Sequence, residues 1–269
     1  MYSLIIALCC GGVTGLALYF TGTFGYGWSI FFGVLGFAAV HMGIGFRMQK
    51  KVKAAMKAVE NTLLDGQKTI QAKTQRWMVR PPGSPQAAQN EIARDQRKFV
   101  EAALALTEPL HRFDNWVPMM KRQIATAQFQ LYWMIKEYRK CDLLMDKVLC
   151  VDPTMYAMKM ARLYMLGRPT EEIGKLYAKG CRRLRYNQNV LLAAAWTWML
   201  VKRNDIDGAF KALNEALKNS DNETLKANRE ALANNRVAHF SNTGIGDTWW
   251  ALGLEEPKVK MQRPRMQWR

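Results

Sequence analysis

The stretch YSLIIALCCGGVTGLALYF, residues 2–20, contains no charged side chain, and the stretch WSIFFGVLGFAAVHMGIGF, residues 28–46, is equally apolar. A helix of 19 residues is roughly 28 Å long at about 1.5 Å per residue, which matches the hydrocarbon core of a bilayer. The segment TGTFGYG between the two stretches is glycine-rich and allows only a tight reversal. Residues 1–46 are therefore predicted to form a transmembrane helical hairpin.

A cleaved signal peptide is the competing interpretation of the first stretch. Such peptides place basic residues ahead of the apolar run, and no basic residue stands ahead of this run. A lipoprotein signal at Cys9 fits poorly too, because Leu8 is bulky and the apolar run before it is too short. The hairpin is therefore the favoured interpretation.

Five basic residues follow the second stretch directly: Arg47, Lys50, Lys51, Lys53 and Lys57. Positive charge next to a spanning helix stays in the cytoplasm. Because a hairpin returns the chain to its starting side, both termini are expected in the cytoplasm, with the bacterial inner membrane as the expected location. The five cysteines agree with a reducing compartment. The same five cations are expected to contact anionic lipid headgroups.

The formal net charge of +17 is concentrated in two blocks, with +7 on residues 47–80 and +5 on residues 258–269. A basic cluster beside a membrane attracts anionic headgroups by about 1 kcal/mol per residue. Lipid therefore explains the first block without nucleic acid. Nucleic acid is disfavoured as a partner because the charge is not spread over the folded body. A membrane-surface or nucleic-acid binder that acts through both blocks is the alternative function.

Small residues four apart predict how the two helices of the hairpin pack. Gly11-x-x-x-Gly15 and Ala39-x-x-x-Gly43 allow two backbones to approach closely. The short loop favours packing within one chain over a dimerisation face. His41 lies near the cytoplasmic end of its stretch, where its ring can reach the interface, so a structural role is favoured over a functional one.

Residues 47–117 are predicted to form a basic stalk that doubles back on itself. Apolar residues recur in steps of three and four at Val52, Met56, Val59, Leu63, Gly66 and Ile70. Gly66 interrupts this seam, since glycine lowers helix stability by roughly 1 kcal/mol. The segment PPGSP, residues 81–85, ends the helix. A second helix over 87–107 carries Ile92, Phe99, Ala103 and Leu106 on one side. An antiparallel helical hairpin is favoured, and dimerisation through the seam is the alternative.

Residues 118–240 are predicted to form a series of helical segments separated by short breaks such as VDPT, GRPT and NSDN. Pairs of residues seven apart, at Cys141/Val148, Gly174/Cys181 and Ala209/Ala216, recur with offsets of 33 and 35 residues. This pattern resembles the tetratricopeptide repeat (TPR) over roughly residues 120–222, with ETLKANREALANN as a capping helix. The resemblance implies an all-α chain in which a TPR-like α-solenoid follows the transmembrane hairpin. The family's proline recurs only at Pro153, so a generic α-solenoid is the alternative.

The TPR resemblance also implies a concave groove lined by the first helix of each repeat. The positions carried over include Gln130, Trp133, Tyr156, Lys159, Leu163 and Trp198. Aromatic residues in a groove suit a peptide that has apolar anchor residues. The alternative is that some of these side chains are buried between helices.

No motif for catalysis or metal binding occurs in the sequence. There is no Walker loop, no His-Glu-x-x-His and no Gly-x-Ser-x-Gly. No Cys-x-x-Cys occurs, and neither His111 nor His239 has a ligand-like spacing to a cysteine. Cys141 and Cys181 are expected at small, buried packing positions. We therefore expect no cofactor, no metal and no enzymatic activity.

The tail, residues 241–269, is aromatic at its start and basic at its end. Residues 245–256, which include Trp249 and Trp250, are expected to dock on the capping helix or in the groove. Residues 258–269 are expected to stay mobile. The sequence thus predicts a membrane-anchored helical-repeat adaptor or scaffold that binds protein through its groove and lipid through residues 1–57. A homo-oligomer is left open.

Overall fold

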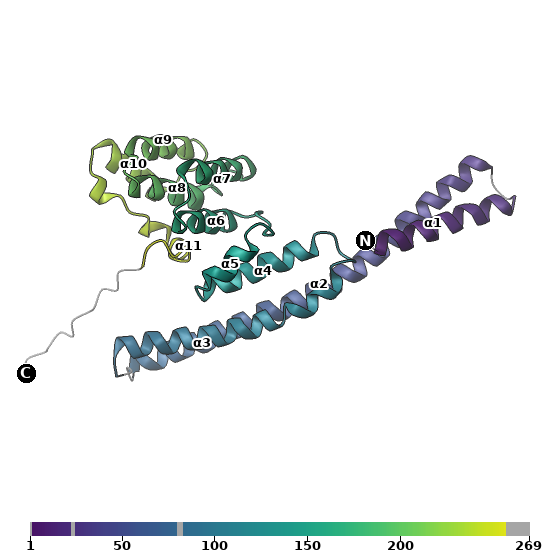
Figure 1. The fold of residues 1–269 in the computed structure, drawn as a ribbon, viewed down its shortest axis with the longest axis horizontal. Coiled ribbons are helices and arrows are strands. Elements are labelled where there is room, and N and C mark those ends of the chain that lie inside the picture. The colour runs from purple at the N-terminus through teal and green to yellow at the C-terminus, as the bar shows by residue number, and fades with distance from the viewer. Residues whose placement is uncertain (1, 23–24, 80–82, 257–269) are drawn as a thin grey trace, which may run out of the picture. The chain divides into compact units, whose positions relative to one another are not determined.

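The computed structural model describes residues 2–22, 25–79 and 83–256, and these residues contain helices and no strand (Figure 1). The prediction of an all-α chain is therefore confirmed. The chain divides into two compact units, Met1–Leu149 and Cys150–Arg269. This division falls inside the segment 118–240 that the sequence assigned to one repeat region.

The first unit is built around one very long helix. In chain order its elements are α1 (Tyr2–Phe20), α2 (Tyr26–Val79), α3 (Pro85–Ala105), the 3-10 helix η1 (Glu108–Phe113), α4 (Met120–Met134) and α5 (Tyr138–Leu144). α1 packs along the first part of α2, and α3 packs along its later part (Figure 1).

α2 runs through the point at which the sequence suggested an interruption, Gly66. It is a single helix of 54 residues, and it also continues across the change from apolar to basic residues after Phe46. Lysine, alanine, methionine and glutamate are good helix formers, and they fill the segment after the apolar stretch. Gly66 also lies inside α2, where a Cβ atom would be 2.6 Å from Cγ of Phe99 on α3. Glycine at this position therefore allows α3 to approach closely and does not end the helix.

The apolar seam of α2 is covered by the same chain. Val52 packs in a buried cluster with Leu110, Phe113, Met120 and Ile124. Val59 packs in a second cluster with Val100, Ala103 and Leu131. Farther along, the Lys73 ammonium lies 2.5 Å from a carboxylate oxygen of Glu91 and of Asp95. Since residue numbers rise along α2 as they fall along α3, the two helices are antiparallel, and α4 completes their core.

The second unit consists of short helices in succession. They are α6 (Pro153–Met165), α7 (Thr170–Arg183), α8 (Val190–Lys202), α9 (Ile206–Leu217), α10 (Glu223–Ala233), η2 (Val237–His239), η3 (Thr243–Ile245) and α11 (Asp247–Trp250). α8 contacts α6, α7, α9 and α11, and α9 also contacts α10. The side chains of Asp152, Asp205 and Asn222 accept hydrogen bonds from backbone N–H groups in the first turns of α6, α9 and α10.

α8 is the centre of the second unit, and nine of its 13 residues are buried. A helix that is apolar on every side needs neighbours on every side, which α8 has. α7 approaches α8 closely at Gly180, which leaves room for the side chains of Leu192 on α8 and Tyr156 on α6. Glycine there permits α7 to lie directly on α8.

The pairs of residues seven apart do not behave alike. Cys141 and Val148 are both buried, but α5 ends at Leu144, so they do not share a helix and this part of the repeat pattern is wrong. Ala209 and Ala216 are both buried on α9. Cys181 lies on α7 and is only half-buried, because the neighbouring Gly180 occupies the tight position in its place. The prediction that Cys181 fills a small buried position is therefore wrong as well.

Candidate functional site

α1 and the first part of α2 expose most of their apolar surface. In their most apolar windows only 17% and 11% of the residues are buried, and both helices are long and apolar enough to cross a membrane. The buried residues of α1 are Ser3, Ala7 and Gly11, all of them small. A helix in the core of a water-soluble protein would be buried on its apolar sides. The exposed apolar surface of this hairpin therefore needs a cover that the described chain does not provide.

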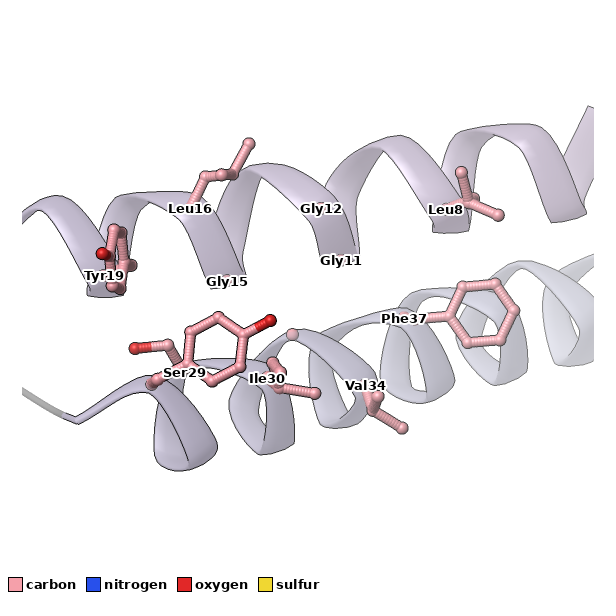
Figure 2. Close-up of a pocket in the computed structure, with 12 residues that line it drawn as sticks. Leu8, Gly11, Gly12, Gly15, Leu16, Tyr19, Ser29, Ile30, Val34 and Phe37 are labelled. Carbon is pink, nitrogen blue, oxygen red and sulfur yellow. The ribbon is translucent and has the colours of Figure 1, made fainter.

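The two helices meet through small residues, as Figure 2 shows. A Cβ atom on Gly11 would lie 2.7 Å from the carbonyl oxygen of Gly33 and 2.8 Å from Cβ of Phe37. A Cβ atom on Gly33 would lie 3.0 Å from the carbonyl oxygen of Gly11, and one on Gly15 would lie 3.2 Å from that of Ser29. Close backbone packing of this kind is typical of helix pairs in membranes.

The prediction for the second helix of this contact is wrong. Ala39 and Gly43 are exposed, and nothing lies within 4 Å of a Cβ atom built on Gly43. Gly11 and Gly15 meet Ser29 and Gly33 instead. Ala39 and Gly43 lie on a different side of α2, and sequence spacing alone did not show which side would face α1.

Beside this contact the hairpin is hollowed by an apolar cavity of about 680 Å³ (Figure 2). Leu8, Leu16 and Tyr19 border it from α1, and Ile30 and Val34 border it from α2. Gly12 also lines it, and nothing lies within 4 Å of a Cβ atom on that residue. The cavity is suited to an apolar chain rather than to a polar ligand, because nearly all of its lining is hydrocarbon.

Aromatic side chains stand at both ends of the hairpin. At one end the rings of Tyr2 and Trp116 are 5.5 Å apart, and at the other end those of Tyr19 and Tyr26 are 6.3 Å apart. Tyr2 and Tyr19 are separated by roughly 26 Å along α1, at about 1.5 Å per residue. Tyrosine and tryptophan are enriched at the two surfaces of a membrane at about this separation.

The basic residues after the apolar stretch lie on the surface of α2. Arg47, Lys50, Lys51, Lys53 and Lys57 are all exposed, and none forms an ion pair with a described residue. Their charges are therefore available to an anionic surface. They occupy about three turns of helix directly beyond Phe46.

The aromatic members of the predicted groove are core residues. Trp133, Tyr156 and Trp198 keep 4%, 1% and 6% of their surface exposed, so a partner cannot reach them and this part of the prediction is wrong. Trp133 stacks on Phe129, and Trp198 packs edge-on against Tyr164. The physical reason is that large apolar rings at helical spacing fill the space between helices.

The remaining groove residues do not form one surface with them. Gln130, Lys159 and Leu163 are half-buried. Gln130 and Trp133 belong to the first compact unit, whereas Tyr156, Lys159, Leu163 and Trp198 belong to the second. The predicted groove therefore combined residues from two separate bodies.

A different recess lies in the second unit, with a volume of about 500 Å³. Thr154, Val190 and Asn222 contribute to it from the starts of α6, α8 and α10, and Ile245 and Thr248 contribute from the tail. Its lining is both polar and apolar. Sequence reasoning missed it because it combines helix ends with a distant loop, and no local pattern marks such a combination.

The start of the tail is docked on α8. Trp249 is fully buried and its ring lies 6.0 Å from that of Trp198. The indole N–H groups of Trp198 and Trp249 donate to the two carboxylate oxygens of Glu255, at 2.8 and 3.0 Å. Trp250 is half-buried. The prediction for residues 258–269 lies outside the described residues.

A buried asparagine pair also holds this segment in place. Asn228 of α10 donates to the side-chain oxygen of Asn242 at 2.8 Å, and Asn242 donates to the carbonyl oxygen of Ala194 on α8 at 3.0 Å. Both asparagines are at most 2% exposed. Hydrogen-bonded buried amides fix one arrangement of the segments that carry them, because breaking a bond leaves a polar group without water.

The five cysteines form no disulfide bond with one another. Burial disfavours the thiolate and raises the pKa of Cys150 and of Cys181. A raised pKa makes a cysteine less nucleophilic at neutral pH. Within residues 2–22, 25–79 and 83–256, no three His, Cys, Asp or Glu side chains are grouped in a way that could hold a metal ion.

No protein-family model, curated protein or solved structure matches this chain. Its function has to be inferred from its own residues and contacts.

Proposed function

We propose that this protein is a membrane-anchored helical scaffold. In this proposal α1 and the first part of α2 cross a membrane as a hairpin, and the rest of the chain binds protein on the cytoplasmic side. The observation that carries the proposal is the exposed apolar surface of the hairpin, of which only a narrow strip of small residues is used internally. Removing apolar surface from water stabilises a structure by about 25 cal/mol per Å². A bilayer is the cover that suits a hairpin of this length.

The charge distribution supports the orientation. Five unpaired cations stand on α2 directly beyond Phe46, whereas the described residues of the opposite turn carry no charge. Basic residues next to a span stay in the cytoplasm. Both termini then face the cytoplasm, and the bacterial inner membrane is the membrane we propose.

Helix spacing in the second unit is consistent with a scaffold of stacked helix pairs. α6 and α8 begin at Pro153 and Val190, and α7 and α9 begin at Thr170 and Ile206, so the two helix pairs are offset by 37 and 36 residues. α6 and α8 also contact each other directly. Contact between the first helices of successive pairs is expected in stacked helical repeats.

For the partner surface we propose the recess at the starts of α6, α8 and α10. It is open, and it combines apolar side chains such as Val190 and Ile245 with hydroxyl and amide groups such as Thr154 and Asn222. A peptide segment with one or two apolar anchor residues suits such a lining. This surface replaces the predicted groove, whose aromatic residues are buried.

Affinity purification of the full-length protein from crosslinked membranes in mild detergent tests the proposal. We expect the wild-type protein to retain a protein partner. The variant Thr248→Arg, which fills the recess from an exposed position, should lose that partner. Ala178→Arg adds the same side chain at an exposed position on α7 and should retain it. A wild-type protein that is repeatedly purified alone, or an equal yield of partner with both variants, contradicts the proposal.

A further inference from the structure

A cavity of about 610 Å³ lies in the first unit, at the base of the hairpin. α2 contributes Met48, Lys51 and Ala55 to its lining, and η1 with the turn after it contributes Arg112, Phe113 and Trp116. The two sets of residues are about sixty positions apart in the sequence. The cavity therefore exists only because the turn after η1 folds back onto α2.

Three contacts hold the walls of this cavity. The backbone N–H of Tyr2 donates to the carbonyl oxygen of Asn115 at 2.9 Å, and the Tyr2 ring packs edge-on against Trp116 at 5.5 Å. Phe113 is 5% exposed and packs in the buried cluster that contains Val52. The start of α1, the middle of α2 and the turn after η1 are thus fixed to one another. Such fixed walls can recognise a ligand by shape as well as by charge.

The cavity lies at the level of a headgroup layer if the hairpin spans the bilayer. Lys51 is five residues beyond Phe46, which corresponds to roughly 7.5 Å along α2. The polar layer on each side of the hydrocarbon core is roughly 5–8 Å thick. Trp116 packs on Tyr2 at the first turn of α1, which is where an interfacial tryptophan is expected.

Two cations face this cavity without an anionic partner. Lys51 and Arg112 are exposed, and neither forms an ion pair with a described residue. The Arg112 guanidinium lies 4.7 Å from the centre of the Phe113 ring, a contact that restricts its position. Asp114, which is close in sequence, is bound to His111, with 3.0 Å between the carboxylate oxygen and Nδ1. An arginine fork and a lysine together are a favourable pair for a phosphate group.

We propose that this cavity binds the phosphate of one anionic phospholipid, with Arg112 and Lys51 as its ligands and Trp116 beside the glycerol region. The proposal rests on the membrane anchorage proposed above. The apolar wall formed by Met48, Ala55 and Phe113 favours a lipid over free phosphate, because inorganic phosphate has no apolar part to bury. The site is distinct from the diffuse attraction of the exposed lysines on α2, since Arg112 comes from another segment.

Native mass spectrometry of the full-length protein, titrated with phosphatidylglycerol in detergent, tests the site. We expect one tightly retained lipid. Arg112→Gln and Lys51→Gln should each weaken retention about fivefold, which corresponds to about 1 kcal/mol. Lys98→Gln is the matched control, because Lys98 is an exposed cation on α3 that does not line the cavity. Its neighbour Phe99 contacts Gly66, which is 15 residues beyond Lys51 on α2. Equal retention by wild type, Arg112→Gln and Lys98→Gln would overturn the proposal.

Two further arms separate this site from its alternatives. Excess inorganic phosphate should not displace the lipid, and displacement would assign the cavity to free phosphate and overturn the lipid assignment. Phosphatidylcholine, which carries no net charge, should be retained weakly by all variants, and retention as tight as that of phosphatidylglycerol would contradict recognition by two cations. Membranes that contain the protein are first washed at alkaline pH. Release of the protein by this wash would overturn the proposed membrane anchorage. If the protein stays in the membrane but shows no preference for phosphatidylglycerol, only the lipid site is overturned.

Discussion

α1 and α8 are both apolar on nearly every side, yet they are buried to very different extents. Three of the 19 residues of α1 are buried, compared with nine of the 13 residues of α8. α8 is surrounded by α6, α7, α9 and α11, whereas α1 packs mainly on α2. The comparison teaches that apolar composition specifies only that a helix must leave water, and that contacts within the chain decide whether the protein itself covers it.

The two helices also differ in how they contact their neighbours. α1 meets α2 through glycine and serine, with backbone against backbone. α8 meets α6 and α11 through large side chains, where Trp198 packs against Tyr164 and Trp249, and on the α7 side its Leu192 packs on Gly180. In water, burying large side chains stabilises a helix pair. In lipid, the environment proposed for the hairpin, that driving force is missing and close backbone packing takes its place.

The largest effect is expected from shortening a buried leucine of α8. Leu192→Ala removes a fully buried side chain that packs against Gly180, and it should destabilise the second unit by roughly 2–5 kcal/mol. Urea unfolding of the full-length protein in detergent, followed by circular dichroism, measures the change. Leu4→Ala on α1 is the matched control: Leu4 is 48% exposed, so its effect should stay below about 0.5 kcal/mol. Similar losses for both variants would remove the distinction between the two helices.

An intermediate effect is expected from adding one methyl group to the hairpin contact. Gly11→Ala places a Cβ atom against the backbone of Gly33, and overpacking of this kind destabilises by roughly 1–3 kcal/mol. Titration with SDS, followed by the near-ultraviolet circular dichroism of the aromatic pairs at the hairpin ends, reports the loss of packing. Gly12→Ala points into open space and should leave the transition unchanged or shift it to higher SDS. If Gly12→Ala shifted the transition to lower SDS more than Gly11→Ala did, the side of α1 that packs on α2 would be wrongly assigned.

The smallest effect is expected where the tail completes the cover of α8. Glu255→Gln keeps one oxygen acceptor but presents an amide NH₂ group to the second indole N–H, so we expect a loss of about 1 kcal/mol. Trypsin should then cut after Arg236 about fivefold faster than in the wild type. Glu171→Gln makes the same charge change at an exposed position on α7 and should leave the rate unchanged. An unchanged rate of trypsin cleavage in Glu255→Gln would mean that the Glu255 carboxylate does not hold the tail.

The sequence was sufficient where one local property decided the outcome. Two charge-free stretches of adequate length specified the pair of apolar helices, and steps of three and four residues specified the side of α2 that carries Val52 and Val59. The segment PPGSP was predicted to end one helix before a second helix over 87–107, and the structure starts α3 two residues earlier, at Pro85, with Ser84 as its cap. These features depend on the chain within a few turns of helix.

The sequence was not sufficient where distant segments meet. A buried tryptophan in a helical pattern looks the same as one that lines a groove, so Trp133 and Trp198 were assigned to the wrong environment. No local signal places Arg112 and Trp116 beside Lys51, because that contact depends on how η1 folds back. The side of α2 that faces α1 depended on the geometry of the whole hairpin, and for that reason Gly33 was missed and Gly43 was chosen.

Labelling of single introduced cysteines in intact bacterial cells tests the membrane hairpin most directly. Thr21→Cys lies in the turn after α1, and Gln67→Cys lies on the exposed side of α2 beyond the basic residues. The reagent is a membrane-impermeant maleimide, and labelling of the native cysteines in the parent protein is the baseline. Thr21→Cys should be labelled in intact cells. Gln67→Cys should be labelled only after lysis. Labelling of Gln67→Cys in intact cells, or of Thr21→Cys only after lysis, would contradict a hairpin that crosses the membrane from the cytoplasm.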